Sequence, residues 1–412
     1  MSVRSRISAY VVYLATEATD AFFFSLITTA SALYMIEVAH LGALQLVLVG
    51  TALELSALIF EVPTGVVADS ISRRLSIIIG EGLLGIGFLV WTIPFFIPIL
   101  VAQVLWGLGA TFVSGAWQAW IADELQGQDV GRAYLRGSQF SYAGALAGIG
   151  ASVLVASVFS LQVAMLAGGV GYLVLALVLA FVMPEQHYRP QSRGERSHLR
   201  AMTDTLLAGV HTVRGAPVLL TILVITFIGG AASETFDRLW QLHLIDNFTF
   251  PTAPSLTPIA WFGLVMAVSL LVSIGAVEVM RRRIDTDSHL STARALLVIN
   301  VVLMVSMAVF ALAGSFELAI GSYLLGRIMR RVAIPLSDAW INQSLTPNVR
   351  ATVISMNAQT DAVGQIAGGP LLGWLAAAAG TRAAMLAVAA FLIPSALLYV
   401  RTIRRHGRDV IG

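Results

Sequence analysis

Two pairs of acidic residues lie inside long apolar stretches of this chain. Glu17 and Asp20 are three residues apart, and Glu234 and Asp237 repeat that spacing. Residues three apart share one face of a helix, so each pair would present two carboxylates to the same side. Carboxylates at membrane depth are costly and normally face a wet cavity or a partner. The spacing therefore indicates sites for a proton or a cation, unless a buried arginine simply neutralises each acid.

Two arginines occupy a further apolar stretch, at 316–342. Arg327 and Arg330 lie one helical turn apart there. At about 1.5 Å per residue, Arg327 would lie ~16 Å from the outer end of a helix, near the middle of a membrane. The two guanidinium groups could form an ion-pair gate with the acidic pairs, or could anchor a substrate carboxylate. A structural salt bridge explains them equally well, so the sign of the substrate's charge stays open.

Two single acids are further candidates for proton binding. Glu54 lies in the apolar stretch 44–64, on the same face as Glu61 but deeper. Asp361 lies inside the stretch 352–378. Each could bind a proton or serve a structural role.

The composition indicates which elements must position these residues. The chain has 412 residues, of which 57% are hydrophobic. Only 12% are charged, roughly half of the fraction in a soluble protein. A spanning helix needs ~20 mainly apolar residues, so the chain has room for about a dozen. We therefore expect an all-α integral membrane protein that crosses the lipid bilayer many times. Since the chain contains no cysteine, disulfides and thiolate metal sites are excluded.

Twelve membrane spans follow from the apolar stretches and the polar breaks between them. They cover residues 8–37, 44–64, 75–96, 98–122, 136–158, 161–183, 217–245, 257–279, 290–313, 316–342, 352–378 and 382–402. Arginines gather at one set of ends, for example at 73–74, 132–136 and 281–283. Positively charged residues favour the cytoplasmic side. Both termini are therefore predicted to be cytoplasmic.

The longest polar segment, 184–214, divides the chain into two nearly equal parts. We expect a six-helix bundle at 1–183, a cytoplasmic linker at 184–214 and a second six-helix bundle at 215–412. The linker begins with proline, serine and arginine, which is typical of a connecting segment. Its later part, 198–213, could form a short amphipathic helix at the cytoplasmic interface.

The two parts repeat short patterns in the same order. The acidic pair of the first span returns in the seventh, and Ala-Trp-Ile at 119–121 returns at 339–341. A Gly-x-x-Ala-Gly pattern at 144–148 returns at 364–368. Each match is weak by itself, but matches in order at a nearly constant separation indicate a duplicated unit. We therefore expect two pseudo-symmetric bundles of six helices.

A polar motif between the second and third spans gives the repeat a family resemblance. Gly65–Arg74 reads GVVADSISRR, and we expect a ten-residue loop at a membrane face. The pattern G-x-x-x-D-x-x-x-R-R resembles the signature between helices 2 and 3 of the major facilitator superfamily, in particular the twelve-helix bacterial drug/proton antiporters. The resemblance implies alternating access, a prokaryotic plasma (inner) membrane, and a central cavity lined by helices 1, 4, 7 and 10. Both acidic pairs would then lie on the substrate path.

The resemblance also implies roles for the motif. Gly65 would let helices 2 and 11 approach closely, and Asp69 would lie against the positive N-terminal end of helix 11. Arg73 would bridge to an acid at the end of helix 4. Such a cluster would close the two halves on the cytoplasmic side. The predicted gate comprises Gly65, Asp69, Arg73, Arg74, Asp123 and Glu124.

One departure from the family pattern concerns proton coupling. Antiporters of this superfamily usually carry an arginine in helix 4 ahead of a Gly-x-Gly. Here Gly107 and Gly109 are present, but Gln103 occupies the arginine position. The helix 4 proton relay is therefore not expected, and the first acidic pair becomes the best candidate for the proton.

Three functions fit these patterns. The favoured one is proton-coupled efflux of drugs or of amphiphilic or cationic small molecules, by secondary active transport. The alternative is proton-coupled import or export of a small anionic metabolite, and the third is a membrane receptor or scaffold without transport. No phosphate loop, metal-spaced histidine cluster or nucleophile elbow appears, so we expect no enzyme activity, no cofactor and no nucleic-acid partner. We expect a monomer whose partners are a small-molecule substrate, protons and lipid. The predicted binding residues are Glu17, Asp20, Glu54, Glu234, Asp237, Arg327, Arg330 and Asp361.

Overall fold

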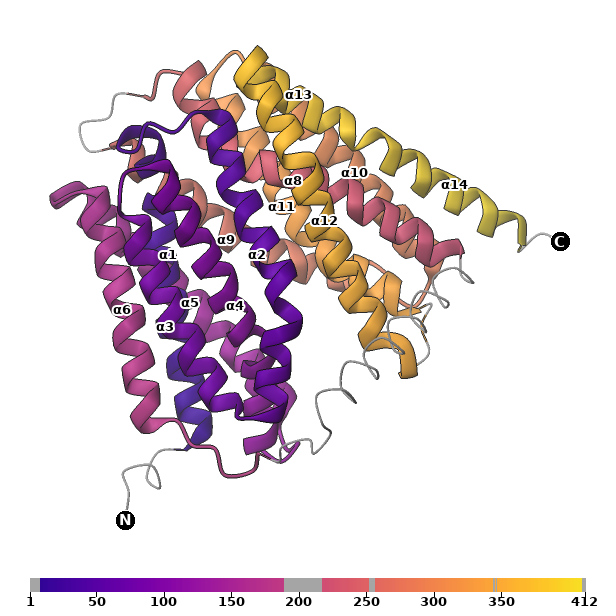
Figure 1. Cartoon of the computed structure of the whole chain (residues 1–412). Helices are drawn as coiled ribbons and strands as arrows, with labels where there is room; N and C mark the ends of the chain where they lie inside the picture. Colours follow the sequence, from indigo (N-terminus) through magenta and orange to yellow (C-terminus); the bar gives the residue numbers. More distant parts are fainter. Residues whose placement is uncertain (1–7, 189–216, 252–255, 344, 346, 410–412) are drawn as a thin grey trace. The chain divides into compact units, whose positions relative to one another are not determined.

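The computed structural model describes residues 8–188, 217–251, 256–343, 345 and 347–409, and all regular structure in these ranges is α-helical. Figure 1 shows the helices as long rods. Their bounds are α1 (Ala9–Glu37), α2 (Ala43–Ser70), α3 (Arg73–Trp91), α4 (Phe96–Glu124), α5 (Val130–Val158), α6 (Leu161–Val182), α8 (Pro217–Asn247), α9 (Pro258–Arg283), α10 (His289–Leu312), α11 (Phe316–Gln343), α12 (Pro347–Ala379), α13 (Thr381–Phe391) and α14 (Ile393–Asp409).

Eleven of the described helices are long and apolar enough to cross a membrane, with α13 and most of α14 counted as one. In hydrocarbon every backbone N–H and C=O must be satisfied inside the chain, which a helix achieves. The twelfth predicted span, at 316–342, forms α11 but is not among the eleven. It carries Arg327, Arg330, Arg331 and Asp338.

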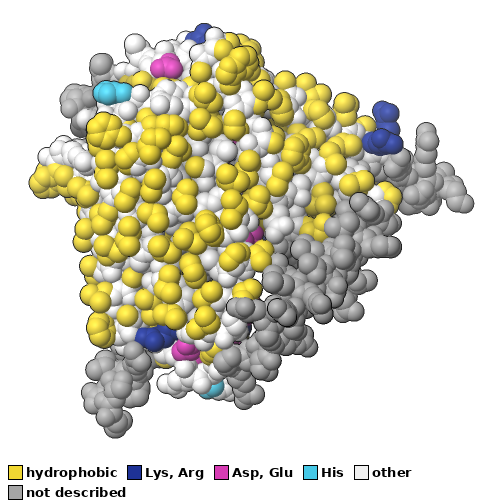
Figure 2. Space-filling view, in the orientation of Figure 1, with side chains coloured by type: hydrophobic (Ala, Val, Ile, Leu, Met, Phe, Trp, Pro, Cys, Tyr) yellow, Lys and Arg dark blue, Asp and Glu magenta, His cyan; other side chains and the backbone are white. Residues whose placement is uncertain are grey.

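The outer surface supports a membrane environment. Phe95, Leu135, Phe159 and Phe181 each expose more than half of their surface. Figure 2 shows apolar side chains over most of the visible face, with most of the visible charged side chains near its two ends. Such a large apolar surface would be a liability in water and suits lipid instead. The described chain is therefore an integral, multi-pass membrane protein.

The structure corrects the expected loop at Gly65–Arg74. The helix α2 continues through Ser70 and α3 begins at Arg73, so only Ile71 and Ser72 separate them. A helix satisfies its own backbone groups, and it need not end where the apolar residues end. The Ser72 side chain caps α3 by accepting a hydrogen bond from the backbone N–H of Leu75. The motif therefore lies mostly on helical backbone.

The last predicted span, 382–402, is also corrected, because it consists of two helices. Pro394 is the second residue of α14 and has no N–H to continue the ladder from α13. The carbonyl of Ala390 instead accepts a hydrogen bond from the N–H of Leu392. Asn300 of α10 donates to the Leu392 carbonyl at 3.2 Å, which helps to hold the break. A proline thus divides this span without leaving its backbone unsatisfied.

The described helices belong to two compact units. The first comprises 1–41, 52–194 and 253–267, and the second comprises 42–51, 195–252 and 268–412. The expected division into 1–183, 184–214 and 215–412 stays a prediction. Most of the linker and its amphipathic helix at 198–213 lie outside the described residues.

In the first unit, α1 packs against α5 and α6, and α3 packs against α4 and α6. The α1–α5 contact depends on small residues. A Cβ atom added to Gly144 would collide with the carbonyl of Ala18, and one added to Gly148 would collide with the carbonyl of Phe22. The two backbones therefore touch, which places α1 and its acids in the interior of this unit.

In the second unit, α8 packs against α12 and α13, and α10 packs against α11. Gly364 and Gly368 of α12 lie against the backbone of Phe227 and Ala231 of α8, in the same manner as the glycines of the first unit. A core that includes Leu219, Trp340 and Tyr399 fills the cytoplasmic-motif end of these helices. The pseudo-symmetry of the two bundles and the side of the termini stay predictions.

Candidate functional site

The first acidic pair lies on α1 with a separate partner for each carboxylate. The indole N–H of Trp117 on α4 donates to Glu17 Oε1 at 2.8 Å. The hydroxyl of Tyr172 on α6 donates to Asp20 Oδ1, also at 2.8 Å. In the described residues neither acid forms an ion pair with a basic side chain. The pair therefore keeps hydrogen-bonded carboxylates without a compensating positive charge.

Aromatic rings surround Glu17. Tyr13 stacks on Trp117 with centroids 5.4 Å apart, and Trp117 stacks on Trp120 at 5.3 Å. Stacked rings next to a carboxylate present both an apolar surface and a negative charge. This combination suits a ligand with a cationic group on an apolar body.

A third acid of this unit, Glu81, was missed by the sequence reasoning. It lies on α3, exposes only 2% of its surface, and its Oε2 atom has no hydrogen-bond partner among the described residues. Its charge interacts with that of Asp20 and with Tyr172. The signal was present, because Glu81 is the single acid of the apolar stretch 75–96.

The second acidic pair, on α8, is engaged in ion pairs. Glu234 Oε1 lies 2.9 Å from Arg238 Nε on the same helix. Asp237 Oδ1 lies 2.7 Å from Arg330 Nη1 on α11. The acids of the two repeats therefore have different surroundings, since only the second pair has arginines as partners.

Arg327 of α11 has aromatic neighbours. Its Nη1 atom donates to the hydroxyl of Tyr323 at 2.7 Å. Tyr323 is fully buried and stacks on Trp240 with ring centroids 4.3 Å apart. No carboxylate forms an ion pair with Arg327 within the described ranges. Arg327 is thus a partly exposed positive charge beside an aromatic stack.

The two single acids differ in what the structure says of them. Asp361 of α12 accepts a hydrogen bond from Gln365 at 2.8 Å, and its charge interacts with that of Arg330. It therefore belongs to the charged network of the second unit. Glu54 is partly buried on α2, and its proposed proton-binding role stays a prediction.

The predicted gate contains a polar cluster at the ends of α3 and α4. Arg73 forms an ion pair with Asp123 and donates to the carbonyl of Ala119 at 2.7 Å. Glu124 instead accepts hydrogen bonds from the backbone N–H groups of Gln186 and His187, at 2.7 and 3.0 Å. Of the two acids considered for Arg73, the structure selects Asp123.

Glu185 extends this cluster and was not anticipated from the sequence. It accepts hydrogen bonds from the Ser72 hydroxyl at 2.7 Å and from the backbone N–H of Arg74 at 2.9 Å. A carboxylate at the N-terminus of a helix is stabilised by the helix dipole. The segment after α6 is thereby tied to the start of α3. The side chain of Arg74 donates to the carbonyl of Ala180 on α6, which strengthens the same contact.

The remaining gate residues, Gly65 and Asp69, are only partly accounted for. The hydroxyl of Tyr188 donates to the backbone carbonyl of Asp69 at 2.8 Å. Burial raises the pKa of Tyr188, so it keeps the proton that it donates. A Cβ atom on Gly65 would meet no described atom within 4 Å. Helix packing at Gly65 and the approach of Asp69 to the start of α12 stay predictions.

Gln103 is fully buried on α4, and neither atom of its side-chain amide has a hydrogen-bond partner in the described parts of the chain. A buried amide without partners is costly. It carries no charge, so it cannot perform the relay expected of an arginine at this position.

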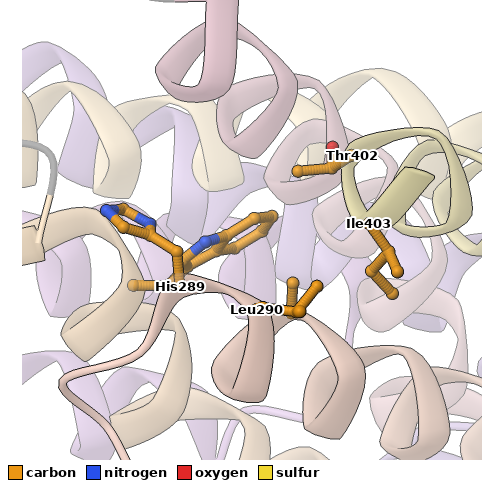
Figure 3. A pocket seen from close by; sticks show the side chains of 6 residues that line it. His289, Leu290, Thr402 and Ile403 are labelled. Carbon is orange, nitrogen blue, oxygen red and sulfur yellow. The ribbon is translucent and has the colours of Figure 1, made fainter. Parts of the chain in front are cut away.

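A small pocket lies elsewhere, between α10, α11 and α14 (Figure 3). Its empty volume is about 160 Å³, below the ~300–1,000 Å³ of typical ligand pockets. His289, Leu290, Thr402 and Ile403 line it together with Ala293 and Trp340. None of the predicted site residues lines this pocket, so it is not assigned a function.

The bundles of spanning helices, with charged residues inside them, define a class of membrane transport proteins, and comparison with known proteins gives the family. The model of the Major Facilitator Superfamily matches residues 14–286. The chain therefore belongs to the Major Facilitator Superfamily, as its motif predicted. It is also 24% identical over 370 residues to the "Uncharacterized MFS-type transporter YxaM" of Bacillus subtilis (strain 168), with 86% of each chain covered.

Solved structures of the same fold support this assignment. The nucleoside transporter NupG has a TM-score of 0.77 at 14% identity, covering 96% of this chain and 99% of that chain. A POT family transporter in complex with 5-aminolevulinic acid has a TM-score of 0.77 at 12% identity, with 96% of both chains covered. At these identities the similarity concerns the fold alone. The family is one of secondary transporters rather than enzymes, and this chain is a transporter of that kind.

Proposed function

We propose that this protein exports cationic or neutral amphiphilic small molecules in exchange for protons, by alternating access. The observation that carries the proposal is the state of Glu17 and Asp20. Both carboxylates are hydrogen-bonded by aromatic side chains, and neither has a basic partner in the described chain. Unpaired negative charge inside a membrane protein marks a site for a cation or a proton.

The surroundings of Glu17 favour an amphiphilic cation. The stacked rings of Tyr13, Trp117 and Trp120 offer an apolar surface beside the carboxylate. A cation over an aromatic face gains about 0.5–2 kcal/mol, with the larger value where water is excluded. A small inorganic cation would gain nothing from the apolar surface, so the rings favour an organic cation.

Competition for negative charge would couple transport to protons. Two carboxylates one helical turn apart cannot both be ionised cheaply in a poorly solvated site, so the pair holds a proton when it is empty. A cationic substrate would favour the ionised pair and expel that proton. Reprotonation from the other side of the membrane would then release the substrate.

A second candidate function is transport of a small anion, and Arg327 favours it. Its guanidinium group has the Tyr323 hydroxyl as a partner and forms no ion pair in the described residues. An arginine in this state can bind a carboxylate with two hydrogen bonds. Against it, the arginines and acids of the second unit largely balance, whereas the acids of α1 have no basic counterpart.

Susceptibility testing would distinguish the two substrate classes. A host strain without its own exporters would express the protein and be exposed to lipophilic cations and to aryl carboxylates, each carboxylate paired with its amide. We expect resistance to the cations. Resistance to a carboxylate but not to its amide would support the anion transporter instead.

Counterflow would test transport itself. Proteoliposomes containing the purified protein and loaded with an unlabelled compound from that panel should transiently accumulate its labelled form. Failure of every compound of the panel would favour a receptor or scaffold without transport. A monomer in a prokaryotic plasma membrane, with the Arg73 cluster closing its cytoplasmic side, is part of the same proposal.

A further inference from the structure

The buried acid Glu81 has no role in the proposed substrate site. It lies in the middle of α3, where Gly80 and Gly85 press this helix against its neighbours. A Cβ atom on Gly80 would come within 2.7 Å of the Gly109 carbonyl of α4, and one on Gly85 within 2.7 Å of the Leu173 side chain of α6. Glu81 is therefore enclosed, which agrees with its 2% exposure.

One carboxylate oxygen of Glu81 lacks any described hydrogen-bond partner. A buried carboxylate in that condition would be strongly destabilised, whereas a carboxylic acid is far less costly. The groups around it offer no positive charge. Tyr172 is the only ionisable residue of α6, and the acids of α4 are Asp123 and Glu124 at its end.

The neighbours of Glu81 instead form a small acidic cluster. Asp20 of α1 is close enough for its charge to interact with Glu81, and Tyr172 interacts with both. Glu17, one turn from Asp20, is the next ionisable group of α1. Tyr172 donates to Asp20 at 2.8 Å and so stabilises the ionised form of Asp20. The cheapest state of the cluster therefore has Asp20 ionised and Glu81 protonated.

We propose that Glu81, Asp20 and Tyr172 form a proton-binding site inside the first unit, with the proton on Glu81. Asp20 is partly exposed while Glu81 is enclosed, so Asp20 connects the site with solvent. The proton moves between one Glu81 oxygen and one Asp20 oxygen, and no other bond changes. The role of this proton in transport rests on the proposed function, but its binding does not.

Infrared spectroscopy of the purified protein at a series of pH values tests the site without any substrate. A protonated buried carboxyl gives a C=O band that disappears when the proton leaves. We expect such a band in the unaltered protein and its loss in Glu81→Gln. The matched control is Glu278→Gln, which changes an exposed acid that pairs with Arg281 and Arg282. It should leave the band unchanged.

Tyr172→Phe supplies a second, independent measurement. Without the hydroxyl, ionised Asp20 loses its donor, and the cluster should keep its proton to a pH about one unit higher. A band that persists in Glu81→Gln would overturn the proposal. If that variant does not fold, an unchanged pH profile in Tyr172→Phe would overturn it as well. Loss of the band together with normal counterflow would leave the proton site intact and contradict only its use in transport.

Discussion

At the scale of single residues, the two acidic pairs have the same spacing but different surroundings. Glu17 and Asp20 are held by an indole and a phenol, while Glu234 and Asp237 are held by guanidinium groups. A neutral donor leaves a carboxylate free to take a proton or a cation. A guanidinium group fixes the charged form instead. We therefore assign exchange to the first pair and structure to the second.

Removing either acid of the first pair should uncouple transport from protons. In inverted vesicles with an acidic interior, Glu17→Gln and Asp20→Asn should each reduce gradient-driven uptake of a lipophilic cation at least about tenfold, a change of ~1.4 kcal/mol. Counterflow without a gradient should persist in part. Full gradient-driven uptake in both variants would move the proton to Asp361 or Glu54.

The Asp237–Arg330 ion pair should contribute to stability. Asp237→Asn leaves the arginine without its partner, and thermal unfolding in detergent should occur at a lower temperature. The pair is partly exposed, with 45% and 30% of the two side chains accessible, so the loss should be smaller than the ~3–5 kcal/mol of a fully buried pair. The double variant Asp237→Asn/Arg330→Gln should recover part of the loss. Equal stability of single and double variants would refute this assignment.

At the scale of helices, the sequence predicted the existence of the spans better than their ends. All twelve predicted stretches are helical in the described chain, because each is long and apolar. The ends were missed where polar residues continue a helix, as at Gly65–Ser70, since hydropathy reports the membrane and not the hydrogen-bond ladder. The break at Pro394 was missed for the converse reason, because it falls within apolar sequence.

The close contact between α1 and α5 can be tested with two glycines of one helix. Gly144 lies against the Ala18 carbonyl, whereas a Cβ atom on Gly150 would meet nothing within 4 Å. Gly144→Ala should therefore lower the stability of the protein by ~1–3 kcal/mol through overpacking. Gly150→Ala should be neutral or slightly stabilising. Thermal unfolding in detergent measures both, and equal effects would show that the helices do not touch here.

The polar cluster at the starts and ends of α3 and α4 should control the conformational equilibrium. Arg73→Ala removes the ion pair with Asp123 and should slow transport, with a shift away from the outward-open state. Spin-label distances across the cytoplasmic side measure that shift. The exchanged pair Arg73→Asp/Asp123→Arg serves as the control and should restore part of the rate. An unchanged distance distribution in Arg73→Ala would show that the cluster does not act as a gate.

At the scale of the whole molecule, the family was predictable and the substrate was not. A short motif, a repeat and a composition determine the family, because each reports a property of the entire bundle. The candidate site depends on individual contacts that no spacing reveals. Glu81 illustrates the difference, since its sequence position shows an acid in a span but not that it meets Asp20. Glu185 likewise caps α3 across a long separation in the chain.

The predicted topology can be tested directly, because the chain contains no cysteine. Single cysteines at Gln128, between α4 and α5, and at Gly314, between α10 and α11, should lie on opposite sides of the membrane. A membrane-impermeant thiol reagent applied to intact cells should label Gly314→Cys and not Gln128→Cys. The reverse labelling would place both termini outside the cytoplasm.

Exchange of one cation for a proton is tested most directly by proton release on binding. Purified protein in a weakly buffered solution with a pH indicator would receive tetraphenylphosphonium, a lipophilic cation. We expect proton release that saturates with binding and is absent in Asp20→Asn. Saturable binding of the cation to the unaltered protein without any release of protons would contradict the exchange mechanism.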